Sequence, residues 1–87
     1  MPKLGNETPV YTREQGFDMQ IAYDASKRTE YVGISAPGTA TSVLKWSIYR
    51  LKYDTTSGGV SIRRYADSSD GFEFSWDLKH TYTYLGI

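Results

Sequence analysis

The side chains in this sequence that are capable of chemistry are few, and their spacing builds no catalytic or metal site. His80 is the only histidine and there is no cysteine, so no nucleophile with an activating base is indicated. Asp67, Asp70, Glu73 and Asp77 form an acidic cluster, but two serines separate its first two aspartates, whereas a calcium loop needs oxygen ligands at alternate positions before its glycine. We therefore predict no catalytic residue, no cofactor and no metal, and a protein that is not an enzyme.

Basic and aromatic side chains are interleaved along residues 45–53 and again along residues 63–65. Proteins that bind single-stranded nucleic acid stack bases on such rings and hold the backbone with such cations. Exposed rings beside polar residues are also the main requirement for stacking on a sugar. Ten basic and ten acidic residues give no net charge, and this neutrality removes the electrostatic attraction that most nucleic-acid-binding proteins use. Nucleic acid is therefore disfavoured as a partner, and a sugar stays open as an alternative.

The composition indicates a small domain that needs more than its own core for stability. At 87 residues the chain is one domain that buries a limited share of its surface, and without cysteine no disulfide can staple it. Eight tyrosines, three phenylalanines and two tryptophans supply large rings that suit a core as well as an interface. Stability is therefore expected from aromatic packing or from assembly with other chains.

The first part of the chain divides into an arm and the beginning of a β domain. Residues 1–16 are polar and show no periodicity, so we expect an extended arm that leads into a single β domain formed by residues 17–87. Apolar and polar residues alternate over residues 19–23, and a polar turn leads from there into residues 30–35. This pattern predicts a hairpin.

The longest periodic segment, residues 43–54, is predicted to be a strand. A Ser/Gly-rich loop follows it, and residues 60–66 return as the second strand of a hairpin. The apolar phase of the longer strand slips between Ile48 and Leu51. Such a slip favours a bulge or a sharp twist near residues 49–50, or a strand that bends from one packed layer into another.

The last third of the chain changes its pattern twice. Phe72 and Trp76 lie four residues apart in a stretch without alternation, residues 67–79, which favours one or two helical turns or an irregular loop. Residues 81–85 alternate again and predict a final strand. Together the segments predict an all-β fold, a small antiparallel sandwich or barrel of five to six strands with one short helical turn near the C-terminus.

The large apolar and aromatic residues divide into an expected core and an expected contact surface. The expected core consists of Trp46, Ile48, Ile62, Phe72 and Trp76. The expected interface consists of Val10, Tyr11, Tyr49, Arg50, Tyr53, Arg63 and Tyr65. Tyrosine and arginine fit the second group because both combine apolar area with a polar end.

No segment of the sequence indicates secretion or a membrane. The first residues have no apolar run behind their single charge, and no stretch approaches membrane-spanning length. The protein is expected to be made in cytoplasm-like solvent and to have no membrane partner.

Several motifs between residues 31 and 84 follow one another in a specific order. They are Tyr31-Val32-Gly33, the turn Pro37-Gly38-Thr39-Ala40-Thr41-Ser42, the strand start Lys45-Trp46, the pair Tyr53-Asp54, and the block Ala66-Asp67, Phe72 and Trp76-Asp77. In this order they resemble a family of short, uncharacterised proteins encoded by tailed bacteriophages, mostly among virion genes. The resemblance implies a virion context and brings no catalytic residues with it.

The resemblance and the composition together lead to one functional expectation. We expect a non-enzymatic structural protein of a bacteriophage virion, made in the host cytoplasm, that decorates the capsid or forms part of the neck, tail or fibre. Its partners would be copies of itself and other virion proteins, because repeated symmetric contacts stabilise a small subunit many times over. One alternative is a module that binds carbohydrate or single-stranded nucleic acid, and another is an accessory protein made during infection that does not enter the virion.

Overall fold

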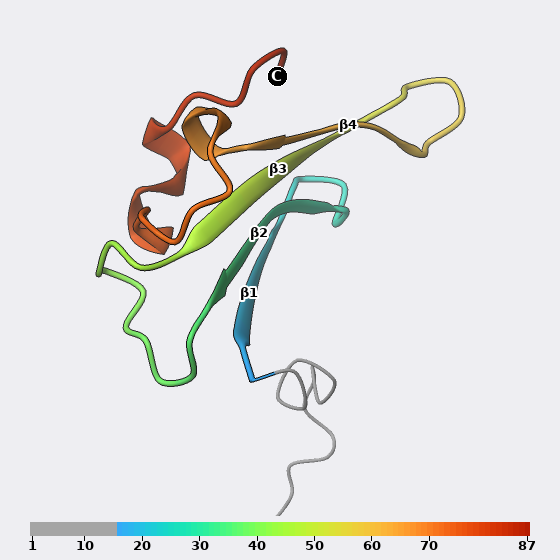
Figure 1. Ribbon diagram of the computed structural model, residues 1–87. Helices are drawn as coiled ribbons and strands as arrows, with labels where there is room; N and C mark the ends of the chain where they lie inside the picture. Colours follow the sequence, from blue (N-terminus) through green and yellow to red (C-terminus); the bar gives the residue numbers. More distant parts are fainter. Residues whose placement is uncertain (1–15) are drawn as a thin grey trace, which may run out of the picture.

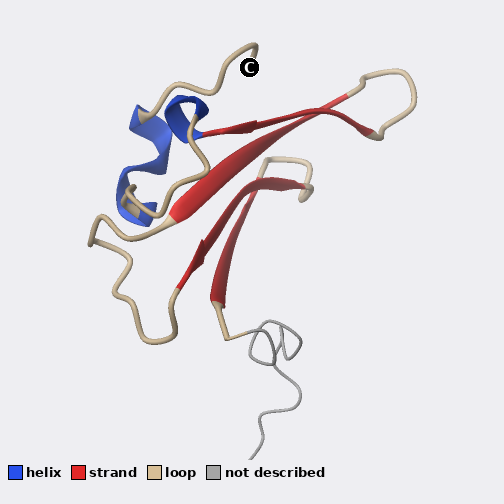
Figure 2. Ribbon diagram, viewed as in Figure 1, coloured by secondary structure: helices blue, strands red, loops and turns tan. Residues whose placement is uncertain are grey.

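The computed structural model of this protein describes residues 16–87. Within that range the chain forms four strands and two 3-10 helices, namely β1 (Asp18–Tyr23), β2 (Thr29–Ser35), β3 (Ser47–Tyr53), β4 (Val60–Tyr65), η2 (Ala66–Ser68) and η3 (Trp76–Thr81). The strands pair antiparallel in the order of the sequence, so the sheet is an open meander with β1 and β4 at its edges (Figure 1). Both helical segments lie near one end of β3 and β4 (Figure 2).

The prediction of an all-β fold is confirmed at this level, but the sandwich or barrel of five to six strands is wrong for residues 16–87. The predicted strand at residues 81–85 does not form. Thr83 pairs with Asp67 instead, donating its N–H to the Asp67 carboxylate at 2.9 Å and accepting from the Asp67 N–H at 2.8 Å. The alternating rings in this segment serve to place Tyr84 in the core, so their period does not mark a strand.

The strand predicted over residues 43–54 is shorter in the structure and begins at Ser47. Before it, residues 40–43 form a turn closed by a backbone hydrogen bond. Trp46 forms an isolated antiparallel bridge with Phe74, with N···O distances of 2.9 and 3.0 Å in the two directions. This bridge ties the C-terminal segment to the start of β3.

The bulge predicted near residues 49–50 is wrong, because the register of β3 with both neighbours is continuous there. The shift lies further along, between Lys52 and Tyr53. The slip in apolar phase has another cause. Ile48 packs in the core on one face of the sheet, while Leu51 lies on the other face, so β3 carries apolar side chains on both faces.

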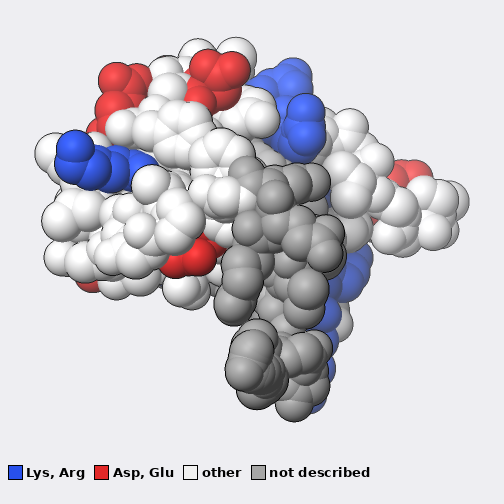
Figure 3. Space-filling model, turned by 60° about the horizontal axis from the view of Figure 1, so that its bottom comes forward, with Lys and Arg blue, Asp and Glu red and all other residues white. Residues whose placement is uncertain are grey.

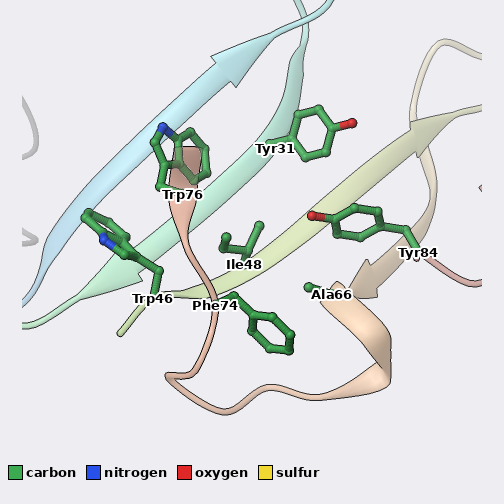
Figure 4. Close-up of a cluster of buried hydrophobic side chains, with 7 residues drawn as sticks. All are labelled: Tyr31, Trp46, Ile48, Ala66, Phe74, Trp76 and Tyr84. Carbon is green, nitrogen blue, oxygen red and sulfur yellow. The ribbon is translucent and has the colours of Figure 1, made fainter. Parts of the chain in front are cut away.

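One face of the sheet is covered by the chain that follows β4. The buried side chains there form a single cluster of Tyr31, Trp46, Ile48, Ala66, Phe74, Trp76 and Tyr84, with Ile48 at its centre (Figure 4). The expected core residues Trp46, Ile48 and Trp76 are among them. Ile62 is only half-buried and lies outside the cluster, since β4 is an edge strand with one neighbour.

Phe72 was expected in the core and is 51% exposed. The expectation rested on helical spacing to Trp76, whereas Ser75 has extended backbone angles, with φ −100° and ψ 128°. In an extended chain residues two apart share a side, so Phe74 and Trp76 are buried together. Phe72 is left to stack on Phe17, with ring centroids 6.0 Å apart.

A sharp reversal of the chain after β4 makes this cover possible. Asp67 and Ser68 both have positive φ, 48° and 61°, a backbone conformation that residues other than glycine seldom adopt. The paired hydrogen bonds between Asp67 and Thr83 hold the reversal from the other side. Residues 69–87 can therefore return across the sheet.

Candidate functional site

The face of the sheet opposite to the buried cluster carries a second set of apolar side chains. The register places Ile21 opposite Val32, Val32 opposite Tyr49, and Tyr49 opposite Tyr65. Residues directly opposite on neighbouring strands point to the same face, so these four side chains form one row across all four strands of the described sheet. We call them the apolar row.

The apolar row is partly shielded and partly open. Val32, in the middle, is 5% exposed although it lies outside the buried cluster, and Ile21 at the β1 edge is 37% exposed. Met19 and Ile34 pair beside the row on the same face. The solvent-facing side of an antiparallel sheet is normally polar, so a sheet face with apolar side chains, opposite to the core, is a candidate contact surface.

The β4 end of the apolar row combines rings with a cation. Tyr49 and Tyr65 meet edge to face, with centroids 5.5 Å apart and an interplanar angle of 68°. The Arg63 guanidinium lies 5.2 Å from the Tyr49 centroid and 5.7 Å from the Tyr65 centroid. Tyrosine and arginine are among the residue types that contribute most to protein interfaces, and the contact of the cation with both rings favours this position of the guanidinium.

The structure brings together three of the seven residues expected at the interface. Tyr49, Arg63 and Tyr65 form the cluster just described. Val10 and Tyr11 lie outside the described residues. The same holds for residues 1–15 of the arm that was expected over residues 1–16.

Arg50 and Tyr53 were expected at the interface but make contacts within the fold. The Arg50 guanidinium pairs with Glu30 at 2.8 Å and lies 5.1 Å from the centroid of the Tyr31 ring, on the core face. The Tyr53 hydroxyl donates to the Thr29 carbonyl at 2.7 Å. These bonds use the polar ends of both side chains, so neither is assigned to the surface.

A second apolar surface lies where Phe17 meets Phe72. The two rings stack with an interplanar angle of 15° and, together with Ala36, Thr39 and Lys45, they line an open hollow of about 330 Å³. Both rings are more than a third exposed. This hollow extends the apolar area of the molecule beyond the apolar row.

Sequence reasoning missed the apolar residues of β1 and β2, although a signal for them exists. The alternation in residues 19–23 by itself predicts a strand with one apolar face. In β2, however, Tyr31 and Val32 are adjacent and both apolar, and adjacent residues of a strand point to opposite faces. The sequence of β2 therefore already indicates a sheet with apolar side chains on both faces.

The charged residues do not gather into a metal site in the described part of the chain. No group of three or more His, Cys, Asp or Glu side chains among residues 16–87 is placed to hold a metal ion. Asp67 accepts from Thr83, and Glu73 accepts from the Ser69 hydroxyl at 2.6 Å.

On the face in Figure 3, basic and acidic side chains form small separate groups with uncharged surface between them. No helix within the same residues has the length and apolar character to cross a membrane.

Two buried tyrosines give a prediction for alkaline pH. Burial raises the pKa of the Tyr31 and Tyr84 hydroxyls above the ordinary value of 10.0. The unfolded chain loses these protons first, so their contribution to stability is complete below pH 10 and decreases as the pH rises above it. Urea unfolding from about pH 8 to about pH 11 should show this decline, and the Tyr31→Phe/Tyr84→Phe variant should show less of it. An equal decline in both proteins would contradict the role of these two tyrosines. So would an equally reduced decline in the Tyr23→Phe variant, which changes an exposed tyrosine.

Comparison with known protein families, curated proteins and solved structures gives no match to this chain. The assignment of its function therefore rests on the geometry of its surfaces and on the resemblance of its motifs.

Proposed function

We propose that this protein is a non-enzymatic structural subunit of a bacteriophage virion. It acts by protein-protein contact, with copies of itself and with other virion proteins, as a decoration of the capsid or as a component of the neck, tail or fibre. It is made in the host cytoplasm and ends in the particle. The observation that supports this best is the apolar row, which crosses the sheet on the face opposite to the core.

The chemistry of the surface supports contact with protein. The apolar row offers Ile21 and the paired rings of Tyr49 and Tyr65 on one face of the sheet, and Arg63 lies beside them. A row of this kind gains free energy when a partner removes it from water, at about 25 cal/mol per Å² of apolar area. Zero net charge allows copies of the chain to approach without repulsion.

The context of a particle suits a domain of this kind. A chain of 87 residues without cysteine has a small core and no covalent staple. Within a symmetric assembly each favourable contact recurs in every copy, so modest contacts add to a stable structure. The motifs between residues 31 and 84 point to the same context.

A pair of charge substitutions on β1 tests the role of the apolar row. Ile21→Glu places a carboxylate in the row, whereas Gln20→Glu places one on the neighbouring residue, which points to the other face. We expect Ile21→Glu to weaken self-association by roughly a hundredfold or more, because an unpaired charge buried at an interface costs about 3–5 kcal/mol. Gln20→Glu should leave it unchanged. Light scattering and native mass spectrometry of the full chain at micromolar concentration give the measurement.

The outcomes that contradict the proposal are distinct. A monomeric full-length chain that is also absent from purified particles would exclude a structural role in the virion. Oligomers that tolerate both substitutions equally would exclude the apolar row as the contact surface. Mass spectrometry of gradient-purified particles of the phage that encodes the chain tests its presence in the virion directly.

A further inference from the structure

The edge strand β4 is protected against pairing with another chain. An edge strand presents a row of backbone N–H and C=O groups that can bind a further strand, and proteins guard such edges with charged side chains and bulges. Arg63 and Arg64 point to the two faces of β4, and the Arg64 guanidinium donates to the Arg63 carbonyl at 3.2 Å. The register with β3 leaves Ser61 as an extra residue on β4. Both kinds of protection are therefore present on this edge.

The edge strand β1 lacks these features. It contains no lysine, arginine or proline, and its single charged residue is Asp18 at its start, whose carboxylate accepts from the Gly38 N–H at 2.9 Å. The register shift between Ala22 and Tyr23 leaves the extra residue, Glu30, on β2, so β1 itself carries no insertion. Within residues 16–87 the outer side of β1 pairs with no strand. β1 is thus the unprotected edge of the described sheet.

The side chains of β1 also favour a partner at this edge. The apolar row ends at Ile21, which is 37% exposed. Met19 and Tyr23 lie on the same face of β1, and Tyr23 is exposed. A strand that pairs with β1 would bind its free backbone groups and would cover these apolar side chains at the same time.

We propose that β1 pairs antiparallel with β1 of a second copy, across a two-fold axis at this edge. The proposal rests on the self-association in the proposed function and names the contact that joins two copies. Pairing of β1 with β4 of another copy would use the protected edge. A two-fold contact uses the unprotected edge of each copy and closes after two copies.

The residues of β1 determine how the two strands align. Residues directly opposite each other share a face of the sheet, so the axis passes through a residue and not between two. With Ile21 on the axis, Met19 lies opposite Tyr23 of the second copy, and every apolar side chain on this face of β1 has an apolar neighbour. An axis at Gln20 or Ala22 would leave Tyr23 or Met19, respectively, opposite a residue outside β1. The apolar rows of both copies then meet at Ile21.

Single cysteines in the full-length chain test this contact, because the chain has no cysteine of its own. Under mild oxidation Ile21→Cys should give at least about tenfold more disulfide-linked dimer than the exposed control Ser61→Cys on β4, because directly opposite residues lie within disulfide reach. A mixture of Gln20→Cys and Ala22→Cys should also form a linked dimer. These two side chains point away from the apolar row, so packing of two rows face to face would not link them.

Hydrogen exchange of the unaltered chain gives a second measurement, which requires no variant to fold. We expect the N–H groups of β1 that point away from β2 to exchange roughly tenfold more slowly at high than at low protein concentration, because pairing protects them. Exchange at the outer edge of β4 should not depend on concentration.

Four results would overturn the pairing of β1 with itself. They are Ile21→Cys dimers no more abundant than Ser61→Cys dimers, no linked dimer in the mixture, β1 exchange that is independent of concentration, and linkage of Ile21→Cys to Ser61→Cys, which would show head-to-tail contact. Self-association in light scattering without the expected links would exclude this edge and leave the apolar row as the contact surface. Absence of the chain from purified particles would exclude the structural role in the virion without affecting the links.

Discussion

Replacing Trp46 by alanine is expected to lower the free energy of unfolding by about 3–5 kcal/mol, a large part of the stability of a domain of this size. Trp46 is 1% exposed, and its indole packs 6.2 Å from that of Trp76 between ring centroids. The indole N–H donates to the Ala40 carbonyl at 2.9 Å. Alanine therefore removes ring packing from the core and the shorter of the two hydrogen bonds that the Ala40 carbonyl accepts, the other coming from the Val43 N–H at 3.4 Å.

Urea unfolding followed by tryptophan fluorescence and far-ultraviolet circular dichroism measures the effect of Trp46→Ala. Leu44→Ala is the matched control, since Leu44 lies two residues away and is 61% exposed, and we expect a change of no more than about 0.5 kcal/mol. A loss at Trp46 as small as the loss at Leu44 would show that the aromatic cluster is not the core.

Gly33→Ala is expected to destabilise the protein by about 1–3 kcal/mol or more through overpacking. Gly33 lies on β2 beneath both indoles. A Cβ atom there would lie 2.5 Å from Cε3 of Trp76 and 3.2 Å from Cε3 of Trp46. The Trp76 ring is itself buried, so it has little free space to move into. Either this ring or the strand must therefore shift at a cost in packing.

Two comparisons make the Gly33 experiment specific. Gly59→Ala, in the loop before β4, should cost little, because its Cβ would meet only Ser57 Oγ at an ordinary 3.7 Å. In a chain that already carries Trp76→Ala, the added cost of Gly33→Ala should fall, since the nearest colliding atoms are gone. Equal costs in both backgrounds would exclude the indole contact as the reason that glycine occupies position 33.

The parts of the fold that depend only on residues close together in the sequence could be predicted from it. Both hairpins follow from local alternation and from polar turns, which need no knowledge of the rest of the chain. The path of the C-terminal segment across the sheet, and with it the choice of which rings are buried, could not be predicted. Phe72 and Phe74 are both aromatic, and the choice between them is made by the bridge of Phe74 with Trp46, a contact between residues 28 positions apart in sequence.

The candidate site divides in the same way. Tyr49, Arg63 and Tyr65 could be grouped in advance because the predicted hairpin pairs β3 with β4. Ile21 and Phe17 could not be assigned to the surface, because the face to which β1 turns depends on where the chain after β4 packs. That chain covers the side of Tyr31, which leaves Ile21 on the other side.

The order of the sheet determines the order in which the protein can be completed on the ribosome. Each strand pairs with the one synthesised just before it, so the meander can form as it emerges. The side chains that close over Ile48 come last, because Phe74, Trp76 and Tyr84 all follow β4 in the sequence. Until these residues have left the ribosome, the core face of the sheet stays open to water, and an exposed apolar face of this kind favours aggregation.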